Sequence, residues 1–175
     1  MLERKKQVKI GDLKKNETLI GPYSIILTPV RMSQVNSNFH YIVRGIIRDG
    51  EHVLLCKQKD GDYTFLLGGH IDFGEAAKVA LAREIKEEID ADVTVGQFRG
   101  AIENAWDDHC EISLVFDVKH NLSKDITPQP ASSDEEHLEF LWVHQDEFHS
   151  HNLLPAPLVD WLTNESHNSW GSTIE

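Results

Sequence analysis

Three glutamates on one predicted helix are the residues of this chain best suited to chemistry. The stretch from Ala76 to Ile89 contains no Gly or Pro and is rich in helix-forming residues, which predicts a helix. Within it, Glu84, Glu87 and Glu88 fall inside one arc of about 100°, because successive helical residues are about 100° apart. Such neighbouring carboxylates repel one another by roughly 0.2–0.5 kcal/mol per pair. A divalent cation that prefers hard oxygen ligands, Mg²⁺ or Mn²⁺, would offset that repulsion.

The residues around these glutamates decide between a metal site and an ordinary acidic surface. On its own, the pattern Glu-x-x-Glu-Glu fits a solvated helix face, and Glu75 fits a helix-capping box with Asp72. However, Gly69 is followed after five residues by Glu75, and Glu75 after seven residues by Arg83-Glu84-Ile85-x-Glu87-Glu88. From Gly69 to Ala91 this spacing resembles the Nudix box, the signature of the Nudix hydrolases.

The resemblance implies both a fold and an activity. It covers residues 39–162 and implies an α+β fold, an α/β/α sandwich in which a mixed β-sheet is flanked by helices. The implied reaction is hydrolysis, dependent on Mg²⁺ or Mn²⁺, of a phosphoanhydride bond in a nucleoside diphosphate linked to another group, with water attacking phosphorus. Nucleotide sugars, ADP-ribose and nucleoside triphosphates all remain candidate substrates. The alternative is a Nudix-like module that binds a nucleotide without hydrolysing it, and such a module would be expected to have lost one or more box carboxylates.

The resemblance also implies roles for single residues of the box. Glu84, Glu87 and Glu88 match the family's metal-ligand positions, and the backbone carbonyl of Gly69 is a further expected ligand. Arg83 is expected to hold the glutamate carboxylates in place from outside the metal site.

The general base is expected either within the box or on a late loop. In the first case Glu87 takes this role. In the second case the base is Glu135 or Glu136, which lie in a loop just before a predicted strand. Glu111, beside the start of another predicted strand, is a third candidate. The two loop glutamates also fit plain solvated charge.

The candidates for substrate contact are basic or aromatic. Basic side chains can meet phosphates and aromatic rings can stack on a base, although each residue also fits a role in packing or at the surface. The basic candidates are Arg44, Lys57, Lys59 and Arg99, and the aromatic candidates are Phe65, Phe73 and Trp106.

The rest of the chain predicts the sheet and the domain boundaries. Two Asp-Gly turns separate the first three predicted strands, and a short helix is expected near the end. The Nudix-like domain then spans 39–164, after an N-terminal extension over 1–38 and before a flexible tail over 165–175. The extension contains an apolar run at 23–27, which predicts an added strand either in the same fold or at the contact of a homodimer. The predicted strands are 41–47, 52–57, 63–67, 91–95, 112–118 and 138–143, and the predicted closing helix is 155–162.

Two positions depart from the family pattern. Asp90 stands where the family usually has Gly, and Leu67 where it often has Pro. The end of the helix commonly needs a left-handed residue, a conformation that Asp tolerates better than most residues. Neither departure removes a carboxylate of the box.

The composition limits the partners. A formal net charge of −12 disfavours long nucleic acids and anionic membranes, and leaves a small nucleotide-derived substrate that is reached through a cation. No apolar run approaches the roughly 20 residues of a membrane span, and the start lacks the apolar stretch of a secretory signal. These features predict a cytoplasmic protein. Cys56 and Cys110 are predicted to be reduced and packed, because two cysteines make no disulfide framework.

Overall fold

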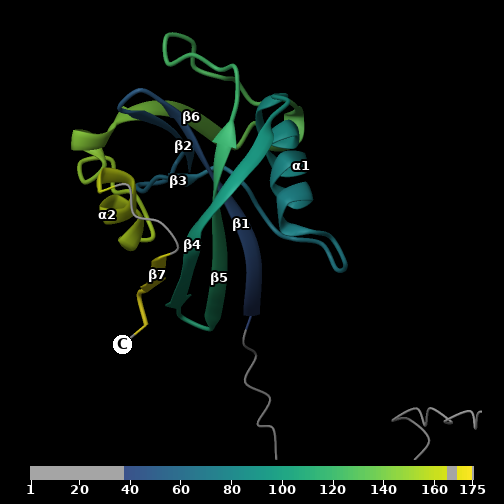
Figure 1. Ribbon diagram of the computed structural model, residues 1–175, viewed down its shortest axis with the longest axis vertical. Helices are drawn as coiled ribbons and strands as arrows, with labels where there is room; N and C mark the ends of the chain where they lie inside the picture. The colour runs from purple at the N-terminus through teal and green to yellow at the C-terminus, as the bar shows by residue number, and fades with distance from the viewer. Residues whose placement is uncertain (1–37, 165–168, 175) are drawn as a thin grey trace, which may run out of the picture. The chain divides into compact units, whose positions relative to one another are not determined.

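The computed structural model describes residues 38–164 and 169–174 (Figure 1). The strand expected over 23–27, with nearly all of the predicted N-terminal extension, lies outside the described residues. The elements of the described part, in chain order, are β1 (Asn38–Asp49), β2 (His52–Gln58), β3 (Phe65–Leu66), α1 (Ala77–Ile89), β4 (Thr94–Trp106), β5 (His109–Lys119), β6 (Leu138–His144), α2 (Pro157–Thr163) and β7 (Ser169–Ser172).

The strands form one mixed sheet in the order β3-β2-β1-β5-β4-β7, with β6 paired to β2. β1 runs parallel to β5 from Asn38 to Ile47, whereas it pairs with β2 only at Arg48 and Asp49, beside the Asp49-Gly50 turn. β1 and β2 therefore separate beyond their hairpin.

The segment after β3 lies along the part of β1 that β2 leaves unpaired. The N–H of Gly45 donates to the carbonyl of Leu67 at 2.9 Å, and the N–H of Val43 donates to the carbonyl of Gly69, also at 2.9 Å. Further along, the Ile71 N–H bonds the Tyr41 carbonyl at 3.0 Å. These backbone bonds fix Gly68 and Gly69 against the middle of the sheet.

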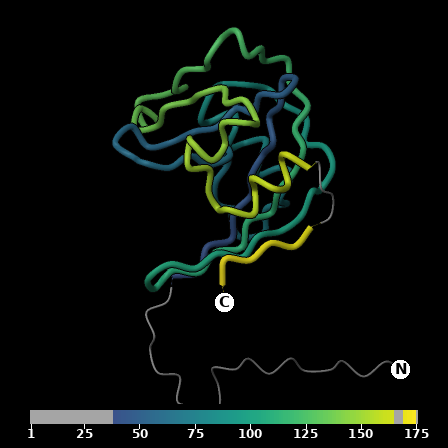
Figure 2. Tube along the Cα trace, turned by 90° about the vertical axis from the view of Figure 1, so that its left-hand side faces the viewer, coloured from purple at the N-terminus to yellow at the C-terminus, as the bar shows by residue number. Residues whose placement is uncertain are grey.

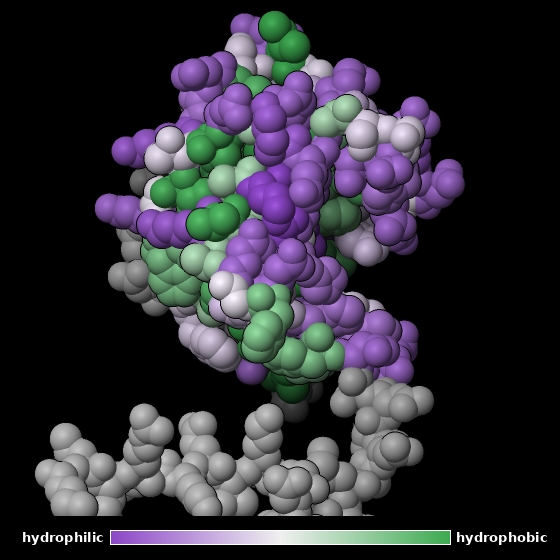
Figure 3. Space-filling view, turned by 90° about the vertical axis from the view of Figure 1, so that its right-hand side faces the viewer, coloured by the Kyte–Doolittle hydropathy of each residue, from purple (hydrophilic) through white to green (hydrophobic). Residues whose placement is uncertain are grey.

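The two helices cover opposite sides of the sheet, as Figures 1 and 2 show. Ala80, Leu81 and Ile85 of α1 are fully buried and pack with Val43 and Ile47 of β1. A second core joins α2 to the other side of the sheet, through residues that include Leu158, Trp161, Leu162, Ile46 and Ile102. The predicted α/β/α sandwich with a mixed sheet is confirmed. The surface on the α1 side is largely hydrophilic (Figure 3).

Two elements differ from the sequence prediction. The strand predicted at 91–95 is β4, which begins at Thr94 and continues to Trp106. Its length was hidden by Gly96 and Gly100, and register shifts against β5 fall between Val95 and Gly100. The flexible tail predicted over 165–175 is corrected at Ser169–Ser172, which form β7 and pair in parallel with β4.

The end of α1 has the conformation that the sequence suggested. Asp90 adopts φ 53° and ψ 31°, the left-handed region, and its N–H bonds the Lys86 carbonyl. Cys56 and Cys110 are both free, and Cys56 is fully buried. Within residues 38–164 and 169–174, no helix combines the length and apolar character needed to cross a membrane.

Candidate active site

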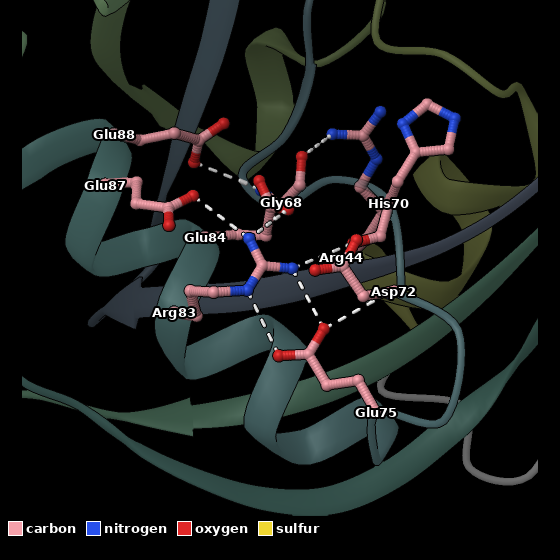
Figure 4. A network of polar contacts seen from close by, with 9 residues as sticks. All are labelled: Arg44, Gly68, His70, Asp72, Glu75, Arg83, Glu84, Glu87 and Glu88. Carbon is pink, nitrogen blue, oxygen red and sulfur yellow. Dashed lines mark hydrogen bonds and ion pairs between the residues drawn. The ribbon is translucent and has the colours of Figure 1, made fainter.

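Two adjacent glycines, Gly68 and Gly69, bring the chain after β3 against the acidic side of α1. Figure 4 shows the first of them, Gly68, bonded to Glu88. Gly68 has φ 125°, and a Cβ there would lie 2.2 Å from the Val43 carbonyl oxygen. A Cβ on Gly69 would lie 2.3 Å from Oε2 of Glu84. The first glycine is therefore required by the β1 backbone, and the second leaves the space that the Glu84 carboxylate fills.

Glu88 is the most buried carboxylate of the site, with a relative exposure of 5%. Its Oε2 accepts the Gly68 N–H at 3.1 Å. Burial raises the pKa of Glu88 to about 8, with smaller raising contributions from Glu84 and Glu135, while Arg44 and the Gly68 N–H act in the opposite direction. A buried carboxylate of this kind favours either a proton or a cation as its partner.

Glu84 and Glu87 lie on the same side of α1 as Glu88, as the helical spacing predicts (Figure 4). Glu84 is partly buried, and burial raises its pKa while Arg83 opposes the shift. Glu87 is more exposed, with 54% of its side chain accessible. The three carboxylates thus run from the interior to the solvent.

Arg83 connects these carboxylates to the turn that precedes the helix. Its Nη1 donates to Glu84 Oε1 at 2.8 Å and to Glu87 Oε2 at 3.0 Å. Its Nε and Nη2 donate to the two oxygens of Glu75 at 3.1 and 3.0 Å, and Nη2 also reaches the His70 carbonyl at 3.1 Å. Arg83 therefore joins Glu75 and two of the three box glutamates in one network of hydrogen bonds.

Glu75 closes a turn instead of capping the helix. Its Oε2 accepts the Asp72 N–H at 3.2 Å, as in a capping box, but α1 begins at Ala77 and its N-cap is Ala76. Hydrogen bonding from Arg83 lowers the pKa of Glu75. The ionised Glu75 thus ties the turn to the helix through Arg83.

The donor set of the site fits a hard divalent cation. Glu84, Glu87 and Glu88 offer carboxylate oxygens, the ligands that Mg²⁺ and Mn²⁺ prefer. The Gly69 carbonyl accepts the Val43 N–H, which leaves it one further lone pair. In the described part of the chain, no three His, Cys, Asp or Glu side chains are gathered closely enough to hold an ion as they stand.

A cavity of about 510 Å³ lies beside this site and contains several of the predicted contact residues. Arg44 belongs to both places, because it lines the cavity while its Nη1 donates to the carbonyls of Leu66, at 3.0 Å, and of Gly68. Its guanidinium carbon lies 5.1 Å from the centre of the Phe65 ring. The residues that line the cavity are Arg44, Gln58, Tyr63, Phe65, Leu66, Asn104, Trp106, Glu111, Leu154, Pro155 and Leu158.

Four predicted contact residues do not line this cavity. Lys57 forms an ion pair with Glu139 at 3.2 Å, and Arg99 forms one with Asp117 at 3.1 Å. Lys59 and Phe73 are exposed at the surface. Conversely, the cavity also contains residues that were not predicted from the sequence, among them Tyr63, Asn104 and Gln58. Asn104 would have been found if β4 had been predicted at its full length.

The three candidates for the general base outside the box occupy different surroundings. Glu135 is partly buried in a short 3₁₀ turn and lies close enough to raise the pKa of Glu88. Glu136, the next residue, is exposed. Glu111 lies in the cavity, and its Oε1 accepts the hydroxyl of Ser113 at 2.7 Å.

Comparison with known proteins identifies the family to which this fold and its acidic helix belong. A family model described as the Nudix domain matches residues 38–162, and the chain therefore belongs to the Nudix family. By this membership it is a Nudix-type hydrolase.

Solved structures share the fold at low sequence identity. A MutT protein from Methanosarcina mazei Go1 is 22% identical, with a TM-score of 0.60 over 74% of this chain and 94% of that one. The Escherichia coli ORF135 protein is also 22% identical, with a TM-score of 0.57 over 74% and 91% of the two chains. An ADP-ribose pyrophosphatase from Streptococcus suis is 18% identical, with a TM-score of 0.52 over 75% and 96%.

Proposed function

We propose that this chain hydrolyses a phosphoanhydride bond in a small nucleotide derivative, with Mg²⁺ or Mn²⁺ as cofactor. The observation that carries the proposal is the position of three box carboxylates, one of them buried, beside a cavity of about 510 Å³ with aromatic and polar walls. Pockets of roughly 300–1,000 Å³ are typical of small-molecule sites. The names of the structural relatives, which include MutT and an ADP-ribose pyrophosphatase, agree with a nucleotide substrate.

Glu84, Glu87 and Glu88 are the proposed metal ligands, with the Gly69 carbonyl as a further one. When bound, a divalent ion neutralises the charge of the phosphate oxygens and orients water for attack. Arg83 positions Glu84 and Glu87 through the hydrogen bonds of its Nη1. Loss of such a supporting contact typically lowers metal affinity or activity by about 10–100-fold.

Glu135 is the general base that the geometry supports best. A carboxylate oxygen of Glu135 takes the proton of the attacking water as the new bond from oxygen to phosphorus forms. The bond from phosphorus to the bridging oxygen then breaks, and the leaving phosphate carries away its electron pair. Glu135 is partly buried and near enough to Glu88 to raise its pKa, which favours it over the exposed Glu136. Glu87, within the box, remains the alternative base.

The test is hydrolysis of a panel of nucleotide sugars, ADP-ribose and nucleoside triphosphates with Mg²⁺ or Mn²⁺, with products separated by chromatography. Wild type should turn over at least one class only when metal is present, and Glu88→Gln should lose at least 100-fold in kcat. Glu139→Gln is the matched control, because its carboxylate is exposed and pairs with Lys57. If the chain bound these nucleotides but hydrolysed none of them, the proposal of an enzyme would be wrong and the alternative of a nucleotide-binding module would stand.

A further inference from the structure

The sheet brings a hydrogen-bond donor and an acceptor together inside the cavity. Asn104 of β4 and Glu111 of β5 are direct partners in the antiparallel pairing of these strands, and both line the cavity. Side chains directly opposite one another on neighbouring strands lie on the same face of the sheet, with Cβ atoms about 4.5–5.5 Å apart. The two polar groups therefore present one continuous edge to a ligand.

The Asn104 amide is oriented by the C-terminal segment of the chain. Thr173, directly after β7, donates its hydroxyl to Oδ1 of Asn104. The Thr173 N–H also bonds the Glu103 carbonyl at 3.1 Å, which fixes the segment to β4. No described group bonds the Nδ2 of Asn104. With its oxygen engaged, Asn104 offers the cavity a donor.

The Glu111 carboxylate is oriented by a buried neighbour on the same strand. The hydroxyl of Ser113, which is 1% exposed, donates to Glu111 Oε1 at 2.7 Å. A carboxylate accepts at both oxygens, and each oxygen has two lone pairs. Glu111 therefore still offers the cavity two acceptors beside the Asn104 donor.

Aromatic rings stand next to this polar edge. Trp106 lies two residues after Asn104, on the same face of β4, and lines the cavity. Its ring is nearly parallel to the rings of His109 and His40. The ring centres lie 5.1 Å apart with an interplanar angle of 2° for His109, and 5.7 Å apart with an angle of 12° for His40. Tyr63, from the segment before β3, also lines the cavity. A planar ring is the kind of ligand that such walls can stack.

We propose that Asn104 and Glu111 read the base of the nucleotide and that they select guanine. The edge of guanine presents one acceptor, O6, followed by two donors, N1–H and N2–H. This order of one acceptor and two donors is complementary to the Asn104 donor followed by the two Glu111 acceptors. Adenine offers one donor and one acceptor and leaves a carboxylate oxygen unpaired, whereas uracil would place its second carbonyl against the carboxylate. The proposal rests on the proposed function in that it takes the ligand to be a nucleotide.

The test compares the binding of GMP and IMP, which differ only in the N2 amino group, by titration calorimetry on the full chain. Wild type should bind GMP at least tenfold more tightly than IMP, since a hydrogen bond to a charged group contributes about 1.5–3 kcal/mol. Glu111→Gln should bring this ratio close to one. Thr173→Val should weaken GMP and IMP alike, because Asn104 meets O6, which both ligands carry.

Glu103→Gln is the matched control, because Glu103 is the neighbour of Asn104 and its side chain alternates to the other face of β4. It should leave the ratio of GMP to IMP affinity unchanged. Equal affinity for GMP and IMP in wild type, or an unchanged ratio in Glu111→Gln, would overturn the proposal. The binding measurement does not depend on turnover. A GMP to IMP affinity ratio of at least ten in a chain that hydrolyses none of the substrates would therefore contradict the proposed enzyme and support the proposed guanine site. Hydrolysis together with a GMP to IMP affinity ratio near one would support the enzyme and contradict the guanine site.

Discussion

At the scale of single residues, the two glycines of the box do different work although they are neighbours. The atom nearest to a Cβ on Gly68 belongs to the backbone of Val43, which cannot move without disturbing β1. The nearest atoms to a Cβ on Gly69 belong to the Glu84 carboxylate, the end of a flexible side chain. The same substitution should therefore damage stability at one position and chemistry at the other.

We expect Gly68→Ala to lower the free energy of unfolding by at least about 2 kcal/mol, from the clash and from the positive φ. Gly69→Ala should cost about 1 kcal/mol or less, while the displaced Glu84 lowers kcat by about 10–100-fold. Urea unfolding and metal-dependent turnover of both variants are the measurements. If Gly69→Ala kept full activity, the position of the Glu84 carboxylate would be irrelevant to the reaction.

At the scale of elements, the left-handed C-terminal end of α1 offers a way to increase the free energy of unfolding. Asp90 adopts φ 53°, which a non-glycine residue adopts at a cost of about 1–2 kcal/mol. Its side chain also pairs with Lys86 at 2.7 Å, but exposed pairs contribute about 0–1 kcal/mol. Asp90→Gly should therefore raise the unfolding free energy by up to about 1 kcal/mol.

Asp90→Ala separates the two contributions, because Ala loses the ion pair and keeps the backbone cost. It should be less stable than wild type, and the glycine variant should exceed it by about 1 kcal/mol in urea unfolding. A glycine variant no more stable than the alanine variant would show that the backbone conformation of Asp90 costs nothing.

The elements also show why the sequence predicted the box better than the cavity. The acidic face of α1 follows from helical spacing alone, so the common side of Glu84, Glu87 and Glu88 could be predicted locally. The cavity joins the segment around β3, the late part of β4 and the loop before α2, which are far apart in the chain. Asn104 lies after the two glycines that concealed β4, and its partner Thr173 lies in a stretch predicted as a flexible tail.

At the scale of the whole molecule, one buried carboxylate should govern how stability depends on pH. The pKa of Glu88 is about 8 in the folded chain against an ordinary value of 4.5. Between these values the folded state holds a proton that the unfolded state has released. The stabilisation is therefore complete below about pH 4.5 and is lost as pH rises through about 8. Since one pKa unit corresponds to about 1.36 kcal/mol, the loss amounts to a few kcal/mol.

Glu88→Gln should abolish this dependence, because an amide stays neutral and its oxygen can still accept the Gly68 N–H. In metal-free buffer the variant should be more stable than wild type at pH 8.5 by a few kcal/mol, with the difference vanishing below about pH 4.5. The chain also carries a net charge of −12, so any lost negative charge relieves some general repulsion. Glu139→Gln removes one exposed charge and isolates that effect; it should shift stability by less than about 0.5 kcal/mol. Urea unfolding at several pH values distinguishes the effect of the Glu88 pKa from that of general charge repulsion. If the free energies of unfolding of wild type and Glu88→Gln changed in parallel with pH, Glu88 would be ionised in the folded chain throughout this range.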